Sequence, residues 1–237
     1  MKRTTFLAAS ASLVAASGTA ASAQTSAPVP GGEHFVERSA DFDAQAFANV
    51  VGRPAQIRSL FEAVAFKPAV LSNIKNAFNG LQFGFGYPAD QIAIAFAGHG
   101  PSAAFAFTDY LWQKYDIPKF HGLVDAAGAP IPSNVYVSDR TPLDGSSDPD
   151  DDKGMYQDTS LQELQKRGLI VLTCHTAVEE QARAIVKKGF APAGMTPTQV
   201  ADDILTHLIP GAVVVPSMVA AIAVLQAKYQ YTYLTLS

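Results

Sequence analysis

The chain has 237 residues, of which 48% are hydrophobic and 16% are charged, and only one of them is a cysteine. This balance favours a folded protein with a substantial core and argues against intrinsic disorder. The formal charge of −4 gives no support to a basic surface, which nucleic-acid binding requires, so we expect no nucleic-acid partner.

The first residues have the three parts of a secretory signal peptide. Lys2 and Arg3 form a basic start, an apolar run extends from Phe6 to about Ala16, and Ala21-Ser22-Ala23 forms a cleavage box. We therefore expect residues 1–23 to be removed and the protein to be periplasmic or secreted. Cleavage leaves 15 basic against 21 acidic residues, a formal charge of −6, because it removes two of 17 basic residues and no acidic one. The apolar run is shorter than the roughly 20 residues that span a bilayer, so we expect no membrane association of the mature form.

The chain after the cleavage site alternates between strand and helix patterns. Residues 24–52 predict a flexible lead, rich in proline and glycine, that ends in a short helix. Residues 53–237 predict a single domain. Its first half has strands at 57–64 and 91–97, each followed by a helix, at 67–83 and 102–115.

Residues 118–158 interrupt this alternation with a proline-rich and glycine-rich segment, which predicts a long surface loop with a short extended piece at 134–138. Order then resumes. The expected elements are a helix at 160–167 with an S-x-x-E capping box, a buried strand at 168–173, helices at 176–188 and 197–208, a strand at 212–215, a helix at 216–228 and a β-rich end at 230–236. The alternation predicts an α/β fold, a doubly wound, mostly parallel sheet of about five strands with helices on both faces.

Three strand-to-helix turns bring polar or reactive groups to the carboxyl edge of such a sheet, where ligands collect. They are Gly98-His99-Gly100, Cys174-His175-Thr176 and Pro216-Ser217. Glycines beside His99 allow a ligand or another chain to approach the backbone closely. Thr176 and Ser217 complete the candidate ligand-binding positions at this edge.

Cys174 is the candidate reactive residue, because a thiol at a helix N-terminus is favoured in its thiolate form. His175 follows it directly, and neighbours in a helix do not face each other, so His99 is the expected partner and Cys174 with His99 the expected catalytic dyad. In the alternative interpretation Cys174 only fills space in the core, as free cysteines commonly do.

Other motifs give no functional signal. The acidic segment at 144–152 resembles a calcium loop only in composition and lacks the ligand spacing, so a solvated loop is expected there and no metal site. The chain has no C-x-x-C, H-E-x-x-H, G-x-G-x-x-G or G-x-S-x-G motif, which leaves redox, zinc, dinucleotide and serine-hydrolase chemistry without support.

Several segments together resemble the DsrE/DsrF-like family, over about residues 55–235 apart from the loop. The segments are RGLIVLTC at 167–174, LIPGAVVVP at 208–216 with Leu225-Gln226 and the run 229–233, and FTDYLWQKY at 107–115. The last is similar to what exported members of the family carry. The resemblance implies a flavodoxin-like α/β fold and frequent homo-oligomers.

In sulfur-trafficking members of that family a cysteine at a strand-helix turn carries sulfur as a persulfide, and Cys174 is the matching position. The resemblance thus implies an exported protein that binds or relays sulfur on Cys174, with His99 assisting and no cofactor. Its partner would be a sulfur donor or acceptor protein or a small sulfur compound. The alternative is a non-catalytic binding or assembly module of the same fold in which Cys174 is structural.

Overall fold

The computed structural model describes residues 35–125, 127–134, 136–137 and 146–236. The predicted signal peptide lies outside these residues, as does the first part of the predicted lead. In the described part, no helix has both the length and the apolar character needed to cross a membrane.

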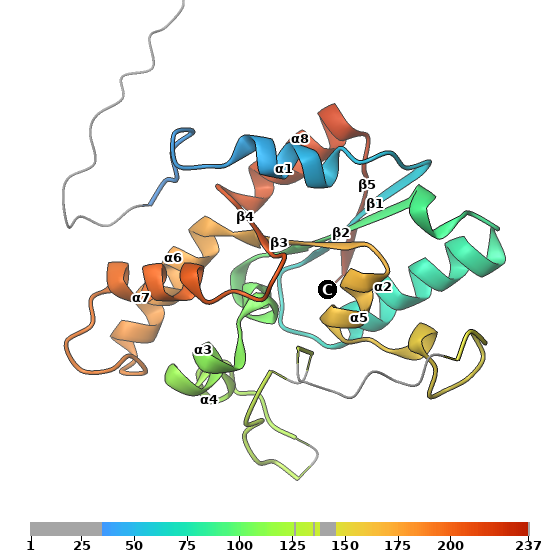
Figure 1. Cartoon of the computed structure of the whole chain (residues 1–237). Helices are drawn as coiled ribbons and strands as arrows, with labels where there is room; N and C mark the ends of the chain where they lie inside the picture. Colours follow the sequence, from blue (N-terminus) through green and yellow to red (C-terminus); the bar gives the residue numbers. More distant parts are fainter. Residues whose placement is uncertain (1–34, 126, 135, 138–145, 237) are drawn as a thin grey trace, which may run out of the picture. The chain divides into compact units, whose positions relative to one another are not determined.

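Five parallel strands form one sheet in the order β4-β3-β2-β1-β5, which confirms the predicted doubly wound α/β fold (Figure 1). All four strand pairs are parallel, so every strand ends at the same edge of the sheet. The strands are β1 (Ile57–Ala63), β2 (Ile92–Gly98), β3 (Leu169–Cys174), β4 (Val213–Val215) and β5 (Thr232–Leu236).

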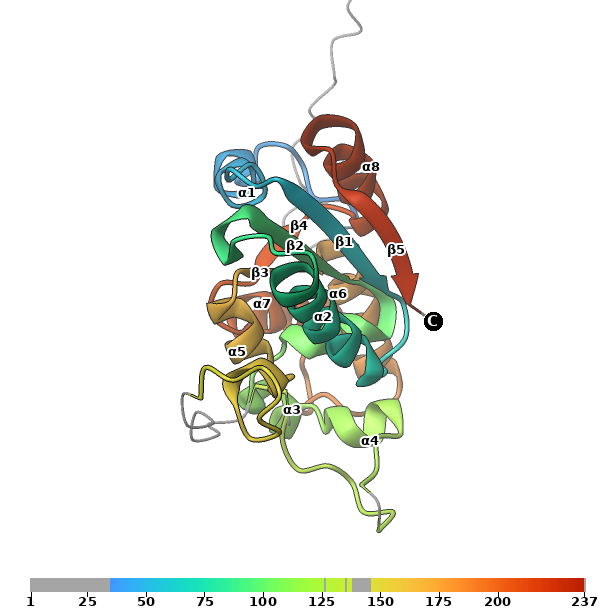
Figure 2. The same cartoon turned by 90° about the vertical axis from the view of Figure 1, so that its right-hand side faces the viewer.

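Helices cover both faces of this sheet (Figures 1 and 2). Helices α1 and α8 pack on one face, α2 and α5 pack on the other, and a third apolar cluster joins α3, α4, α6 and α7. Their bounds are α1 (Ala44–Val51), α2 (Ala69–Asn79), α3 (Asp109–Lys114), α4 (Ile117–His121), α5 (Leu161–Lys166), α6 (His175–Lys187), α7 (Pro197–Thr206) and α8 (Met218–Tyr229). Shorter turns of helix occupy Gly80–Gly84, Ala89–Gln91, Gly100–Ala106 and Met155–Gln157.

Strand β2 explains why the sheet is covered on both faces. All seven of its residues are buried, with small alanines at 93, 95 and 97 facing α1 and α8, and larger side chains at 92, 94 and 96 facing α2 and α5. In contrast, β5 lies at the outer edge beside β1 and is mostly exposed (Figure 2). Because side chains alternate between the two faces along every strand, this pattern also determines which side chains share a face at the strand ends.

The helix predicted at 102–115 is wrong as a single element. The chain forms a 3-10 helix at Gly100–Ala106, becomes extended at Phe107, and starts α3 at Asp109. Two hydrogen bonds to the segment before β4 stabilise the extended backbone at this break. The Thr108 N–H donates to the His207 carbonyl over 3.3 Å, and the Ile209 N–H donates to the Ala106 carbonyl over 2.8 Å. Pairing between distant segments thus overrides the local helical pattern.

The segment expected to be a surface loop at 118–158 is partly built into the molecule. It begins within α4, and the Asn134 side chain is fully buried, where its amide donates to the carbonyls of Phe105 (3.1 Å) and Phe107 (2.8 Å). Tyr136 and Val137 form a turn in place of the expected extended piece. The sequence missed this anchoring because one asparagine satisfies two backbone carbonyls that lie almost thirty residues earlier in the chain.

Candidate functional site

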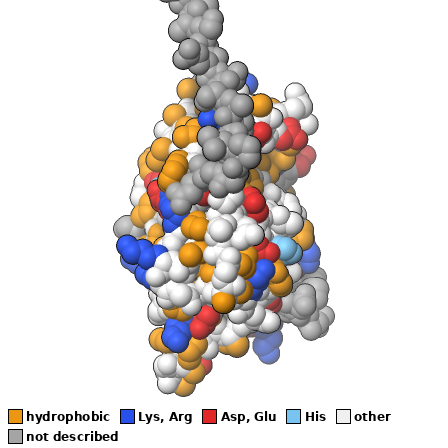
Figure 3. Space-filling view, turned by 90° about the vertical axis from the view of Figure 1, so that its left-hand side faces the viewer, with side chains coloured by type: hydrophobic (Ala, Val, Ile, Leu, Met, Phe, Trp, Pro, Cys, Tyr) orange, Lys and Arg blue, Asp and Glu red, His pale blue; other side chains and the backbone are white. Residues whose placement is uncertain are grey.

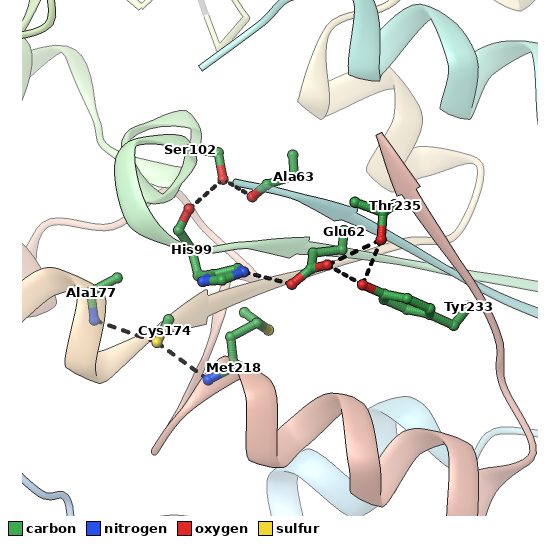
Figure 4. Close-up of polar contacts among 9 residues, drawn as sticks. All are labelled: Glu62, Ala63, His99, Ser102, Cys174, Ala177, Met218, Tyr233 and Thr235. Atoms are coloured by element: carbon green, nitrogen blue, oxygen red, sulfur yellow. Dashed lines mark hydrogen bonds and ion pairs between the residues drawn. The ribbon is translucent and has the colours of Figure 1, made fainter. Parts of the chain in front are cut away.

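Cys174 is the last residue of β3 and the N-cap of α6, so its predicted place at a strand end and a helix N-terminus is confirmed. Helix α6 begins at His175, one residue earlier than expected. The Sγ atom accepts two backbone hydrogen bonds, from the Ala177 N–H at 3.4 Å and from the Met218 N–H at 3.3 Å (Figure 4). Since Met218 is the first residue of α8, the sulfur lies at the N-termini of two helices.

Two backbone N–H donors and two helix N-termini thus point at this sulfur. Cys174 is only 4% exposed and belongs to the apolar cluster under α1 and α8. The sulfur is therefore largely shielded from solvent.

His99 follows the last residue of β2 and continues its extended backbone. Gly98 is paired with Thr173, so the next residues, His99 and Cys174, are level on neighbouring strands about 4.8 Å apart. Alternation along the strands puts both side chains on the face covered by α1 and α8, as Figure 4 shows. Among the hydrogen bonds of the described residues, however, the His99 ring bonds Glu62 and not Cys174.

Glu62, next to the end of β1, is the residue at this edge that sequence reasoning missed. Its Oε1 atom lies 2.6 Å from His99 Nε2, and its Oε2 atom accepts hydrogen bonds from the Tyr233 hydroxyl and, at 3.3 Å, from the Thr235 hydroxyl. The residue is 7% exposed. A signal was present in the sequence: Glu62 lies among apolar residues in a predicted strand, and a carboxylate buried there needs a partner. The structure confirms that the last five residues of β1 are all buried.

The contacts of Glu62 keep it ionised. Burial alone would raise the pKa of this carboxyl, but the hydrogen bonds from Tyr233, His99 and Thr235 hold its pKa below the usual range, and the charge of His99 lowers it further whenever that ring is protonated. The same contact raises the pKa of Tyr233, because its hydroxyl donates to the carboxylate. The group is therefore an ionised carboxylate surrounded by proton donors.

The other predicted ligand positions have structural contacts of their own. A Cβ at Gly98 would lie 3.0 Å from the Ser102 carbonyl oxygen, so the chain itself occupies the space beside this glycine. Gly100 has a positive φ of 58°, and its carbonyl accepts from the Gln181 side chain over 2.7 Å. The Thr176 hydroxyl donates to the Pro216 carbonyl over 3.1 Å, which joins two of the turns at this edge.

Two cavities border these turns. One, of about 230 Å³, lies between α1 and α8 and is mostly apolar, with Ser217 and Pro216 in its wall. The other, of about 250 Å³, is lined by Gly100, which follows His99, by Ala177, three residues after Cys174, and by Phe120, His121, Gln181 and Lys188. Burial holds the pKa of His121 below its usual value, so its ring is neutral at pH 7.

Within the described residues, no group of three or more His, Cys, Asp or Glu side chains could hold a metal ion. On the face shown in Figure 3, Lys and Arg side chains are interspersed with acidic and apolar ones. Comparisons of the chain with models of protein families, with curated proteins and with solved structures found no match. The functional interpretation therefore depends on the geometry of the strand ends.

Proposed function

We propose that this protein is an exported, DsrE-like sulfur carrier that holds sulfur as a persulfide on Cys174. The observation that supports this most directly is the pair of backbone N–H groups, from Ala177 and Met218, that point at the sulfur. Such donors stabilise a thiolate, the form of cysteine that attacks sulfane sulfur. The parallel sheet with the cysteine at a strand-helix turn is consistent with the resemblance seen in the sequence.

The transfer needs no oxidant or cofactor. The Cys174 thiolate attacks the outer sulfur of a donor persulfide, R–S–SH; a new S–S bond forms, the old one breaks, and its electron pair leaves with the donor as R–S⁻. The proton given up by the Cys174 thiol returns to that leaving thiolate. The products, a Cys174 persulfide and R–SH, balance the reactants, and the reverse step passes the sulfur to an acceptor protein or a small sulfur compound.

Burial of Cys174 favours a second candidate function, a non-catalytic binding or assembly module. A sulfur that is 4% exposed, in an apolar cluster, fulfils the packing role that many free cysteines have. In that case the edge of the sheet or one of its neighbouring cavities would bind a partner, such as a second copy of the chain, without chemistry at the thiol.

Intact-protein mass spectrometry separates the two functions, because the chain has a single cysteine and any sulfur it gains has one site. We expect the native protein to gain about 32 Da after incubation with polysulfide and to lose it on addition of a thiol acceptor. The Cys174→Ser variant is the matched control and should gain nothing. A native protein that keeps its original mass, while the unfolded protein gains sulfur, would favour the binding module.

A further inference from the structure

Glu62 has an arrangement that packing alone does not require. A buried carboxylate is costly unless it is hydrogen-bonded or paired, and this one has three donors: an imidazole and two hydroxyls. The Thr235 hydroxyl has a single proton, which it shares between the carboxylate at 3.3 Å and the Tyr233 hydroxyl at 2.5 Å. Among the ion pairs of the described residues, the partner of Glu62 is His99, a titratable base, and not a lysine or an arginine.

The strand register leads this network to the thiol. Glu62 is level with Thr235 on β5 and with Ala97 on β2, and His99 comes two residues after Ala97 on the same face. His99 is in turn level with Cys174 on β3. A row of hydrogen-bonded polar side chains therefore crosses the ends of β5, β1 and β2, and Cys174 lies level with its last member, His99, on the next strand. Figure 4 shows this row and, beside it, the separate contacts of Cys174 with Ala177 and Met218.

We propose that Glu62 is a positioning residue that orients His99 to move the proton during chemistry at Cys174. An ionised carboxylate can only accept a hydrogen bond, so contact with Glu62 places a proton on His99 Nε2 and leaves Nδ1 as the basic nitrogen of the neutral ring. Tyr233 and Thr235 hold the other carboxylate oxygen. Nδ1 takes the Cys174 thiol proton and returns it to the leaving thiolate of the donor.

This inference rests on the proposed function but has a readout that does not require sulfur transfer. The rate of Cys174 alkylation by iodoacetamide, followed across pH by intact mass, reports how readily the thiol loses its proton. The variants are Glu62→Gln, which keeps an acceptor oxygen but loses the charge, and the double variant Tyr233→Phe with Thr235→Val, which removes both hydroxyl donors.

Two controls separate a positioning role from general effects. Glu163 on α5 is a second buried glutamate, paired with Lys166 on the other side of the sheet, and Glu163→Gln matches the chemical change far from the site. His175 follows Cys174 and is the other imidazole near the thiol, so His175→Asn tests whether it takes the proton instead.

We expect Glu62→Gln to lower the alkylation rate at neutral pH about tenfold to a hundredfold and to shift the profile to higher pH, since general-base assistance is lost. The double variant should shift it less, and both controls should follow the native profile. A native profile in a folded Glu62→Gln protein overturns the proposal, as does a shift in His175→Asn alone. If Glu62→Gln does not fold, the double variant decides: a native profile there overturns the proposal.

Sulfur uptake, measured on the same samples, tests the carrier function separately from the positioning role of Glu62. If the native protein gains no sulfur but Glu62→Gln shifts the alkylation profile, the positioning role of Glu62 is supported and the carrier function is refuted. If the native protein and Glu62→Gln gain sulfur at the same rate and with the same pH dependence, the carrier function is supported and the positioning role is refuted.

Discussion

Gly98 lies where the end of β2 comes closest to the 3-10 helix that follows it. A Cβ atom here would be 3.0 Å from the Ser102 carbonyl oxygen and 3.3 Å from the Phe96 ring. The carbonyl is part of the backbone, so it cannot move away from the new atom without distorting the 3-10 helix. We therefore expect Gly98→Ala to lower the free energy of unfolding by about 1–3 kcal/mol, as other overpacked sites do. Urea denaturation measures the change.

Gly84→Ala is the matched control for that substitution, because a Cβ at Gly84 meets no atom within 4 Å. It should leave stability unchanged or raise it by roughly 0.4–1 kcal/mol through the unfolded state. Equal effects of the two substitutions would contradict a packing role for Gly98 and restore the interpretation of this glycine as a position kept open for a ligand.

At the scale of single residues, the sequence located Cys174 but not its surroundings. A lone cysteine after a buried strand predicted its place at the strand end and helix start. The second N–H donor to its sulfur comes from Met218, 44 residues further on, so no local pattern could indicate it. The contact of His99 with Glu62 likewise depends on the pairing of β1 with β2.

Helix α7 shows how much a cap contributes at the scale of an element. The Thr196 hydroxyl accepts from the Gln199 N–H at 3.3 Å, and the Gln199 side chain accepts from the Thr196 N–H at 2.9 Å, a complete capping box. We expect Thr196→Ala to cost about 1 kcal/mol of stability. Ser217 has the same position before α8 but makes no capping bond with its side chain, so Ser217→Ala should cost less. Thermal and urea unfolding of both variants test this, and a larger loss from Ser217→Ala would refute it.

The predicted capping box of α5 formed only in part. Ser160 caps the helix by accepting from the Glu163 N–H at 3.3 Å, but the Glu163 carboxylate pairs with Lys166. The sequence therefore predicted the start of this helix correctly and the partner of its glutamate incorrectly. A helix cap depends on a few adjacent residues and can be predicted from them. A long side chain such as that of Glu163 can reach several partners within one turn, so its actual partner cannot.

At the scale of the whole molecule, two carboxylates should make the fold sensitive to acid. Asp203 on α7 accepts hydrogen bonds from Tyr115 (2.6 Å) and Lys114 (2.9 Å) near the end of α3. Burial alone would raise the pKa of Asp203, but these contacts hold it below its ordinary value of 3.8. Together with Glu62, whose ordinary value is 4.5, it binds fewer protons in the folded than in the unfolded state.

The sign follows from linkage: the stabilisation is complete above the ordinary pKa values and is lost as pH falls through the lower folded values. We expect these two carboxylates to lower Tm progressively below about pH 5. The buried His121, whose folded pKa lies below its ordinary value of 6.5, adds a loss that begins as pH falls through that value. Asp203→Asn should start from a lower Tm at neutral pH and lose less on acidification. Calorimetry across this range is the measurement, and identical slopes for the variant and the native protein would contradict the assignment.

The sequence by itself determined the fold class and most of the elements, because burial on both faces makes strands such as β2 wholly apolar and helices keep their own period. It also determined that Cys174 lies at a strand end. Only the tertiary structure decided the rest: that the helix at 102–115 breaks to pair with residues 207–209, that Asn134 is buried, and that Glu62 meets His99. These outcomes depend on strand order and register, which bring together groups far apart in the chain, and no local pattern carries that information.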